Sequence, residues 1–501
     1  MNIKRAKNEI KNALRAYLSR DEFGAYRIPP IRQRPILLMG PPGIGKTQIM
    51  EQIADETGVG LVSYTLTHHT RQSALGLPYI EHEKFGGQEY TVTAYTMSEI
   101  IASVYREIER TGVKEGILFL DEINCISETL TPMMLQFLQC KTFGNQQLPA
   151  GWVVVAAGNP PEYNKSVREF DVVTLDRVKR IDVEEDFTVW KEYAYRRGIH
   201  GAILSYLEIR RDHFYRVEAT ADGLQFVTAR GWEDLSELMQ VYETLGLTVD
   251  RQVVEQYLQL PRVASDFANY LQLYEKYKRV YRVEEILDGS WERVRASELS
   301  GAPFDEKLGV LGLLLSRLAD SARETYRLDG LTDALHHDLL QIREGEKTLG
   351  TLLDDKRAAL SRRRAAGSTD RDALFIASRE TERLDAMRQG LSLEKIPSGR
   401  AFDYLKEKFQ TDVQARADAV DKTDRQLTNA FAFLDEAIGD SQEMVLFATE
   451  LTANYFTSWF IQNFGCEAYF AHNKRLLFDD THKHLLEEIQ QTRAADQPKE
   501  S

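Results

Sequence analysis

A glycine-rich stretch near the N-terminus carries the residue types that bind phosphate groups. It reads Gly40-Pro41-Pro42-Gly43-Ile44-Gly45-Lys46-Thr47 and fits the phosphate-loop pattern GxxxxGK[ST]. Glycines let the backbone approach phosphate oxygens, and the amides at a helix start supply positive potential. In this pattern Lys46 reaches the β- and γ-phosphates of ATP, and the Thr47 hydroxyl binds Mg²⁺. We include Gln48, the next residue of the expected helix, in the nucleotide-binding segment.

Two adjacent carboxylates follow a second apolar run, about seventy residues further along. The run Ile117 to Leu120 predicts a buried strand, and Asp121 and Glu122 come directly after it. At the C-terminal end of a parallel strand, Asp121 would lie beside the Mg²⁺ site. Glu122 would orient or deprotonate the attacking water. Taken alone, an acidic first turn of a helix explains this pair better, but the phosphate loop favours the catalytic interpretation.

A third apolar run, Val153 to Ala157, ends just before Asn159. An amide at such a strand end could hold the nucleophilic water near the γ-phosphate. The alternative is an ordinary Asn-Pro turn. The local sequence leaves both interpretations open.

These chemical groups need a sheet to bring them together. From Pro35 to Asp186, short apolar runs alternate with helical stretches, which predicts an α/β fold of the P-loop NTPase kind with helices on both faces of a parallel sheet. Apolar residues at helical spacing, including Ile10 and Leu14, predict a helix that leads into this domain. A helix that binds a membrane surface or an acidic partner is the alternative for that segment. We place the nucleotide-binding domain at residues 1–186.

An insertion near residues 74–96 interrupts the α/β pattern. It contains Gly86-Gly87 between two mixed polar and apolar segments, which predicts a β-hairpin. Its aromatic residues Phe85 and Tyr90 could grip a substrate at the pore of a ring. Packing of the hairpin against the ATPase core is the alternative.

The second half of the chain is predicted to be helical. Trp232, Leu235 and Leu238 recur at helical spacing within residues 187–289, which have the size of a small lid domain. Residues 290–501 are expected to form a helical C-terminal domain, extended or coiled. Within it, the charged stretch from Thr369 to Arg383 is interpreted as solvent-facing or linker-like.

Composition narrows the class of protein. With 43% hydrophobic and 28% charged residues and no run long enough for a membrane span, we expect a soluble protein in the cytoplasm. Three cysteines without a paired spacing argue against a disulfide framework, and adjacent histidine pairs such as His336-His337 make poor metal ligands. We therefore expect no structural metal. The formal net charge of −14 makes nucleic acid an unfavoured partner.

The order of these motifs resembles the MoxR group of AAA+ ATPases, in the clade that carries a helix-2 insertion. The resemblance rests on the phosphate loop, the hairpin, the Leu-Asp-Glu strand, the Asn-bearing strand, Leu175-Asp176-Arg177 and Ala229-Arg230-Gly231-Trp232-Glu233. It covers residues 32–242, about half the chain. The helical remainder resembles C-terminal extensions of some bacterial MoxR-type proteins.

The resemblance implies roles for particular residues. Gly40 to Thr47 match Walker A, Asp121 and Glu122 match Walker B, and Asn159 matches sensor 1. Arg177 matches an arginine finger that reaches the γ-phosphate on a neighbouring subunit, and Arg230 matches sensor 2. Arg180 competes for the finger role, because relatives often carry a phenylalanine after the motif. Such enzymes act as homo-oligomeric rings, and a hexamer is expected.

The family also implies a function. MoxR-type ATPases commonly act as chaperone-like remodellers with partners that contain a von Willebrand factor A domain. A nucleic-acid-stimulated motor of the restriction or helicase kind is the main alternative, although the hairpin has mixed charge and the sequence holds no recognisable DNA-binding module. A nucleotide-gated scaffold that scarcely hydrolyses ATP is a third possibility, disfavoured by the intact Lys46, Asp121 and Glu122.

Overall fold

The computed structural model of the chain describes residues 1–68, 76–143, 146–163, 167, 170–220, 223–365 and 370–473. These residues belong to two compact units. The first contains residues 1–189 and 228–231, and the second contains residues 190–227 and those from 232 onward. The predicted division of residues 187–501 into a lid and a separate C-terminal domain stays a prediction.

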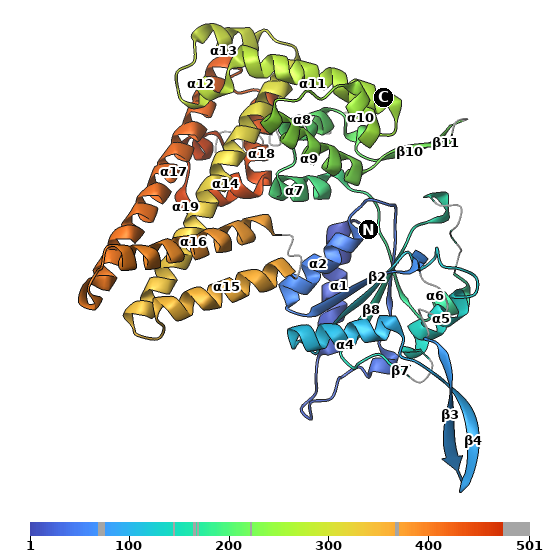
Figure 1. Ribbon diagram of the computed structural model, residues 1–501. Coiled ribbons are helices and arrows are strands. Elements are labelled where there is room, and N and C mark those ends of the chain that lie inside the picture. Colours follow the sequence, from blue (N-terminus) through green and yellow to red (C-terminus); the bar gives the residue numbers. More distant parts are fainter. Residues whose placement is uncertain are drawn as a thin grey trace, which may run out of the picture. The chain divides into compact units, whose positions relative to one another are not determined.

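A parallel sheet forms the centre of the first unit (Figure 1). Its five strands follow the order β2-β5-β8-β1-β9. They are β1 (Ile36–Met39), β2 (Gly60–Thr65), β5 (Gly116–Asp121), β8 (Trp152–Gly158) and β9 (Lys179–Asp182). Every residue of β8 is buried, as expected for an apolar strand covered on both faces. The predicted α/β fold with a parallel sheet is confirmed.

Helices cover both faces of this sheet. Leu38 and Phe119 pack in one hydrophobic cluster with α1 (Ile3–Leu18) and α2 (Lys46–Thr57). Their strand neighbours Leu37 and Leu118 point the other way, because side chains alternate along a strand. They pack in a second cluster with residues of the helices α4 (Glu99–Thr111) and α5 (Thr131–Cys140).

The leading helix belongs to the α/β core. Ile10 and Leu14 of α1 are almost fully buried against the sheet, as the amphipathic pattern predicts. The alternative of a free membrane-surface helix is therefore wrong. Figure 1 shows α1 beside α2 on the same face of the sheet.

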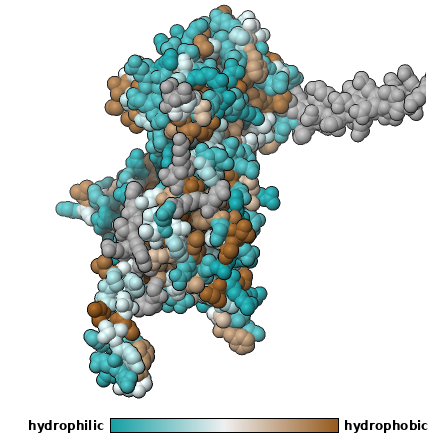
Figure 2. All heavy atoms as spheres, turned by 90° about the vertical axis from the view of Figure 1, so that its right-hand side faces the viewer, coloured by the Kyte–Doolittle hydropathy of each residue, from teal (hydrophilic) through white to brown (hydrophobic). Residues whose placement is uncertain are grey.

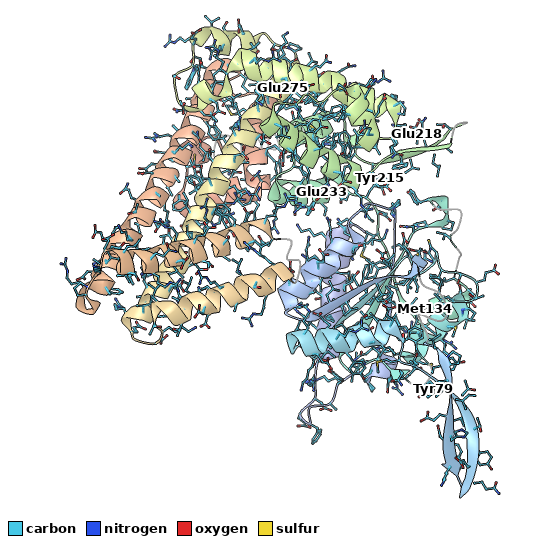
Figure 3. The ribbon with its side chains drawn as sticks, viewed as in Figure 1. Tyr79, Met134, Tyr215, Glu218, Glu233 and Glu275 are labelled. Carbon is cyan, nitrogen blue, oxygen red and sulfur yellow. The ribbon has the colours of Figure 1, made fainter. Side chains whose placement is uncertain are left out.

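The predicted hairpin is present as β3 (Pro78–Phe85) and β4 (Gln88–Tyr95). Gly86 and Gly87 join the strands with φ angles of 60° and 86°, the left-handed values that a tight two-residue turn favours. Every residue of β3 is exposed, including Tyr79 (Figure 3). In Figure 2 the hairpin is the narrow projection at the bottom, where hydrophobic and hydrophilic side chains are mixed. Residues 74 and 75 of the predicted insertion lie outside the described residues.

Short elements complete the first unit. They are η1 (Pro30–Arg32), η2 (Leu66–His68), β6 (Thr142–Phe143), β7 (Gln146–Gln147), η3 (Pro161–Tyr163) and α6 (Val172–Leu175). The helix α7 (Phe187–Arg197) begins where the first unit ends.

The second unit is mostly helical, as predicted. Before α14 the helices are α8 (Gly201–Ile209), η4 (Arg211–His213), α9 (Ala229–Leu245), α10 (Arg251–Tyr257), α11 (Pro261–Tyr281), α12 (Val283–Leu287) and α13 (Arg293–Ser300). Residues 229–231 at the start of α9 belong to the first unit. The C-terminal part consists of α14 (Phe304–Arg343), α15 (Leu349–Ala365), α16 (Arg371–Leu393), η5 (Ser398–Arg400), α17 (Ala401–Ala437), α18 (Gln442–Ala453) and α19 (Tyr455–Phe464). Trp232 and Leu235 are fully buried on α9, so their helical spacing predicts this element correctly.

The second unit differs from the prediction at two places. Residues 187–289 are mainly helical, as predicted, but β10 (Arg216–Thr220) and β11 (Gly223–Val227) form an antiparallel pair that was not predicted. The alternating residues of these two short strands were not recognised, because the segments on either side have helical spacing. Residues 371–383 of the stretch interpreted as linker-like lie in the helix α16, and residue 369 is outside the described residues. There the buried side chain of Asp372 accepts hydrogen bonds from Arg323 and Arg327. Its charge is therefore neutralised by arginines and does not face solvent.

No helix in the described part of the chain combines the length and apolar character that crossing a membrane requires.

Candidate functional site

The C-terminal ends of three strands bring the predicted site residues together. The register pairs Met39 of β1 with Gly158 of β8, and Leu120 of β5 with Ala156 of β8. The phosphate loop, Asp121 and Asn159 therefore leave the sheet at one edge. Parallel sheets bind ligands at this edge.

The backbone of the phosphate loop depends on glycine at two points. A Cβ atom on Gly40 would lie 2.7 Å from the carbonyl oxygen of Val183, which is too close for any side chain. Gly45 has a φ of 90°, in the left-handed region, and directly precedes Lys46, the first residue of α2. The loop therefore turns sharply from β1 into the amide-bearing start of a helix. The loop between Gly40 and Gly45 consists of Pro41, Pro42, Gly43 and Ile44. Gln48 lies half-buried in the first turn of α2.

Lys46 is held by three oxygen atoms of the protein. Its Nζ donates to the carbonyl oxygens of Gly40 and Pro41, both at 2.8 Å, and to Oδ1 of Asn159 at 2.9 Å. Burial lowers the pKa of Lys46 to about 8, partly offset by the charge of Asp121. An ammonium buried at this loop is poised to exchange these oxygens for those of a phosphate.

Thr47 and Asp121 form the second contact of the site. The Thr47 hydroxyl donates to Oδ2 of Asp121 over 3.0 Å. The other carboxylate oxygen of Asp121, Oδ1, accepts from the backbone amide of Glu122 at 2.9 Å. A hydroxyl and a carboxylate are the hard oxygen donors that Mg²⁺ prefers, so this pair fits that cation.

Glu122 has an unusual backbone. Its φ is 56°, in the left-handed region that side chains other than glycine rarely adopt. Such a conformation costs about 1–3 kcal/mol and persists where surrounding contacts fix it, often at functional sites. The charge of Glu122 also acts on Lys46, where it raises the pKa.

Asn159 is held in place by a residue that the sequence analysis missed. The side-chain amide of Asn124 donates to the carbonyl oxygen of Asn159 at 2.7 Å. Asn124 is only 3% exposed and lies against Gly158, where a Cβ atom would be 2.6 Å from its Oδ1. A polar residue shortly after the Asp121-Glu122 pair, in an otherwise apolar segment, was the available signal. Asn124 links the ends of β5 and β8 and positions Asn159.

Arg230 lies beside the phosphate loop. Residues 228–231 belong to the same compact unit as the loop, and a Cβ atom on Gly43 would contact Thr228 and the Cβ of Arg230. The charge of Arg230 lowers the pKa of Lys46, although burial is the larger cause. The structure therefore brings this predicted residue to the site although it is far away in sequence.

The two candidate finger arginines differ in their surroundings. Arg180 is on β9 and pairs with Asp182, with nitrogen–oxygen distances of 2.9 and 2.8 Å. Arg177 is exposed just after α6 and makes no ion pair among the described residues. The pKa of Asp171 is lowered chiefly by hydrogen bonds from Thr174, and the charge of Arg177 adds a smaller effect.

Comparison with known proteins agrees with this geometry. Residues 36–177 match the profile of the family described as "ATPase family associated with various cellular activities (AAA)". The match begins at β1 and ends at Arg177. A search of the curated proteins found no match to the chain. AAA domains generally bind ATP with Mg²⁺, have ATPase activity and typically assemble into rings. Residues 36–177 of this chain are therefore an AAA-family ATPase domain.

Proposed function

We propose that this protein is a Mg²⁺-dependent ATPase of the MoxR type that assembles into a ring and remodels a partner protein. The observation that carries the proposal is a pair of hydrogen bonds at one edge of the sheet, from Lys46 to Asn159 and from Thr47 to Asp121. These bonds join residues that are 113 and 74 positions apart in the sequence. ATP hydrolysis requires this combination of a phosphate-binding ammonium, a Mg²⁺ site and a water-positioning amide.

Each residue has a proposed role. The loop amides from Gly40 to Thr47 and the Lys46 ammonium hold the triphosphate. Thr47 and Asp121 hold Mg²⁺, which when bound neutralises charge on the phosphate oxygens. Glu122 orients and deprotonates the attacking water, and Asn159 keeps that water in line with the γ-phosphate. Arg230, beside the loop, adds positive charge near the transferring group.

The ring completes the site in this proposal. An arginine supplied by a neighbouring subunit stabilises the charge that develops on the transferring phosphoryl group. Arg177 suits the role better than Arg180, because Arg180 is already paired with Asp182. Hydrolysis would therefore depend on assembly, and a hexamer is the proposed form.

The exposed hairpin supports a role in engaging protein. Phe85 and Tyr90 lie on opposite strands near its tip, with ring centroids 5.9 Å apart, and are 54% and 47% exposed. The alternative of packing against the ATPase core does not apply to these side chains. Aromatic rings exposed on a projecting arm suit contact with apolar segments of a client. A partner with a von Willebrand factor A domain is the proposed binding protein, as in similar ATPases.

A trapping experiment tests this function. The Glu122→Gln protein with ATP should bind nucleotide without turning over, and affinity purification from cells should then recover a specific protein partner. Lys46→Ala combined with Glu122→Gln is the matched control, because it cannot hold ATP. Recovery of the same proteins with both variants, or strong salt-sensitive stimulation of the wild-type ATPase by DNA, would contradict the remodelling role. Phe85→Ser and Tyr90→Ser should reduce partner recovery while leaving ATP binding intact.

A further inference from the structure

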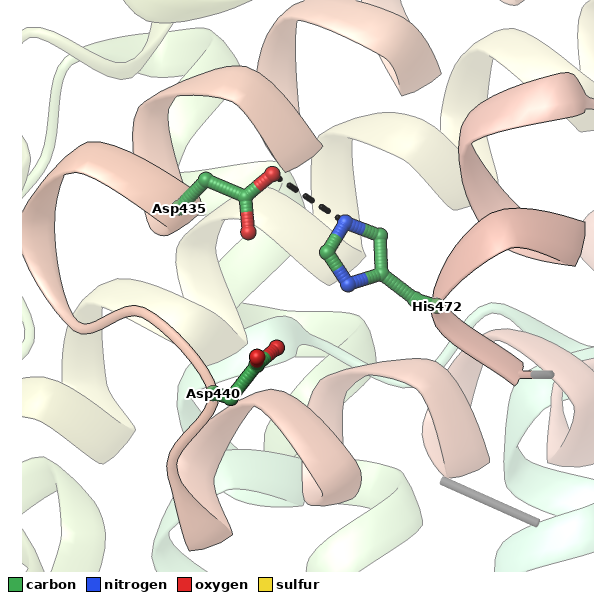
Figure 4. A group of neighbouring side chains, drawn as sticks. All are labelled: Asp435, Asp440 and His472. Atoms are coloured by element: carbon green, nitrogen blue, oxygen red, sulfur yellow. Dashed lines mark hydrogen bonds and ion pairs between the residues drawn. The ribbon is translucent and has the colours of Figure 1, made fainter. Parts of the chain in front are cut away.

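A second group of side chains with metal-ligand chemistry lies in the helical unit. It consists of Asp435 in the last turn of α17, Asp440 in the turn before α18, and His472 in the helical segment 467–473. One donor atom from each residue lies within 4.8 Å of the other two. Figure 4 shows both carboxylates on the same side of the imidazole ring, although the three residues come from separate elements.

The imidazole of His472 is fixed by its own surroundings. It is only 5% exposed, and its ring stacks on Phe431 with centroids 5.0 Å apart and an interplanar angle of 10°. Nε2 lies 3.1 Å from Oδ2 of Asp435. A metal-binding histidine needs its ring plane set in advance, and the Phe431 contact does this independently of the carboxylates.

The distances suit a shared cation. With metal–ligand bonds of about 2.1 Å, two ligands of one ion lie about 3.0–3.4 Å apart in octahedral or tetrahedral geometry. The separation of 3.1 Å between His472 and Asp435 falls in this range. A donor oxygen of the exposed Asp440 lies within 4.8 Å of the other two donor atoms and would move closer to complete the ligand set.

A plain ion pair between His472 and Asp435 is the competing explanation. It accounts for one carboxylate but leaves a second, Asp440, at the same imidazole. The neighbouring Glu436 pairs with Arg293 at 3.7 Å. Asp435 has no lysine or arginine within ion-pair distance among residues 1–473 that the structure describes. A divalent cation would use both carboxylates together with the imidazole, whose donor atoms lie within 4.8 Å of one another.

We propose that Asp435, Asp440 and His472 form a binding site for a divalent transition-metal ion, with Zn²⁺ as the expected occupant. An imidazole among the ligands selects such ions over Mg²⁺ and Ca²⁺, and Zn²⁺ commonly takes a mixture of histidine and carboxylate ligands. Water fills the remaining position, because the two aspartates face solvent. Bound metal fastens the segment 467–473 to the end of α17 and so stabilises the C-terminal part of the helical unit.

Metal binding to the full chain tests the site. After treatment with a chelator, the protein is titrated with Zn²⁺ alone, without nucleotide, by calorimetry. We expect one tight site per chain and a rise in Tm on saturation. Asp440→Asn and His472→Gln should each weaken that site at least tenfold. Co²⁺ is the second probe, since its visible absorption bands should appear with the wild-type protein and be lost with His472→Gln.

Matched controls separate this site from adventitious binding. Glu436→Gln changes the neighbouring carboxylate on α17, and His337→Asn changes an exposed histidine on α14, so both should bind Zn²⁺ like the wild type. Asp440→Asn alters an exposed side chain and should keep the native helical content, which circular dichroism checks. Absence of a tight site in the wild type, or equal affinity in Asp440→Asn and the controls, would overturn the proposal. ATPase activity is not part of this readout, so failure here leaves the nucleotide site unaffected.

Discussion

The Thr47 hydroxyl and Oδ2 of Asp121 are 3.0 Å apart, although 74 residues separate them in the sequence. This contact places a hydroxyl and a carboxylate where one cation can bind both. We predict that Asp121→Asn raises the Mg²⁺ concentration for half-maximal ATPase rate by at least about tenfold, because an amide binds Mg²⁺ less well than a carboxylate. The rate is measured against Mg²⁺ at saturating ATP. Glu109→Gln, on the outer side of α4, is the control and should behave as wild type. An unchanged Mg²⁺ dependence in Asp121→Asn would count against this metal site.

The pKa of Lys46 predicts a pH effect. Burial lowers it from 10.5 to about 8, so above that pH the nucleotide-free protein holds an uncharged amine. Phosphate binding favours the ammonium, so MgATP binding should weaken as pH rises from about 7 to 9 and should take up a proton near its alkaline end. Calorimetry in two buffers of different ionisation enthalpy measures this uptake. An MgATP affinity that does not change with pH, measured without proton uptake, would contradict the lowered pKa of Lys46.

The lowered pKa of Lys46 also affects the free energy of unfolding. The unfolded chain keeps the Lys46 proton up to about pH 10.5, whereas the folded chain releases it near 8. Between these values the unfolded state binds more protons, so this residue makes the free energy of unfolding rise with pH. Lys46→Met should remove that contribution in nucleotide-free protein, which urea unfolding at several pH values would reveal.

A buried ion cluster in the helical unit predicts a large stability effect. Lys191 of α7 lies 2.5 Å from Glu208 of α8 and 2.6 Å from Glu450 of α18, and the Tyr195 hydroxyl also donates to Glu450. These side chains line a cavity of about 420 Å³. Lys191→Met leaves the buried Glu450 without its cation, whereas Glu208 keeps Arg211, and should cost about 3–5 kcal/mol in the free energy of unfolding.

Urea unfolding of the helical unit measures this cost. Arg251→Met breaks the exposed pair with Glu255 on α10 and serves as the control, with an expected loss below about 1 kcal/mol. Equal effects of the two substitutions would show that the buried cluster does not stabilise the unit as argued.

Substitution of the two candidate arginine fingers, Arg177 and Arg180, should have different effects on the ATPase rate. Arg177→Ala should lower the ATPase rate of assembled protein by at least about a thousandfold while leaving ATP affinity within a few-fold, because a finger acts on the transition state of a neighbour. Arg180→Ala, which removes only the pair with Asp182, should keep most of the rate. Mixing Arg177→Ala with Glu122→Gln protein should restore part of the activity if the arginine acts across subunits. The reverse ranking of the two arginines would assign the role to Arg180.

Local patterns with strong physical causes could be predicted from the sequence. The apolar runs of β1, β5 and β8, the turn at Gly86-Gly87 and the buried face of α1 follow from burial and turn geometry alone. The phosphate-loop pattern also predicted phosphate binding by Lys46 and Mg²⁺ binding by Thr47, because few other sites use these residues at this spacing.

Long-range pairing explains what could not be predicted. From the sequence alone, Asp372 and Glu380 were interpreted as solvent-facing charges, because their partners Arg323 and Lys356 lie on other helices. Asn124 was missed because its role depends on a group distant in the sequence, the carbonyl oxygen of Asn159. Arg230 was assigned to the site only through the family resemblance, because its proximity to Gly43 depends on how residues 228–231 return to the first unit.

The most direct test of the account is to measure ATP binding and hydrolysis side by side for the wild-type protein and Glu122→Gln. The wild type should bind MgATP and hydrolyse it, whereas Glu122→Gln should bind with an affinity within a few-fold and lose at least about a hundredfold in rate. Failure of the wild type to bind MgATP, or an unchanged rate in Glu122→Gln, would contradict the proposed site.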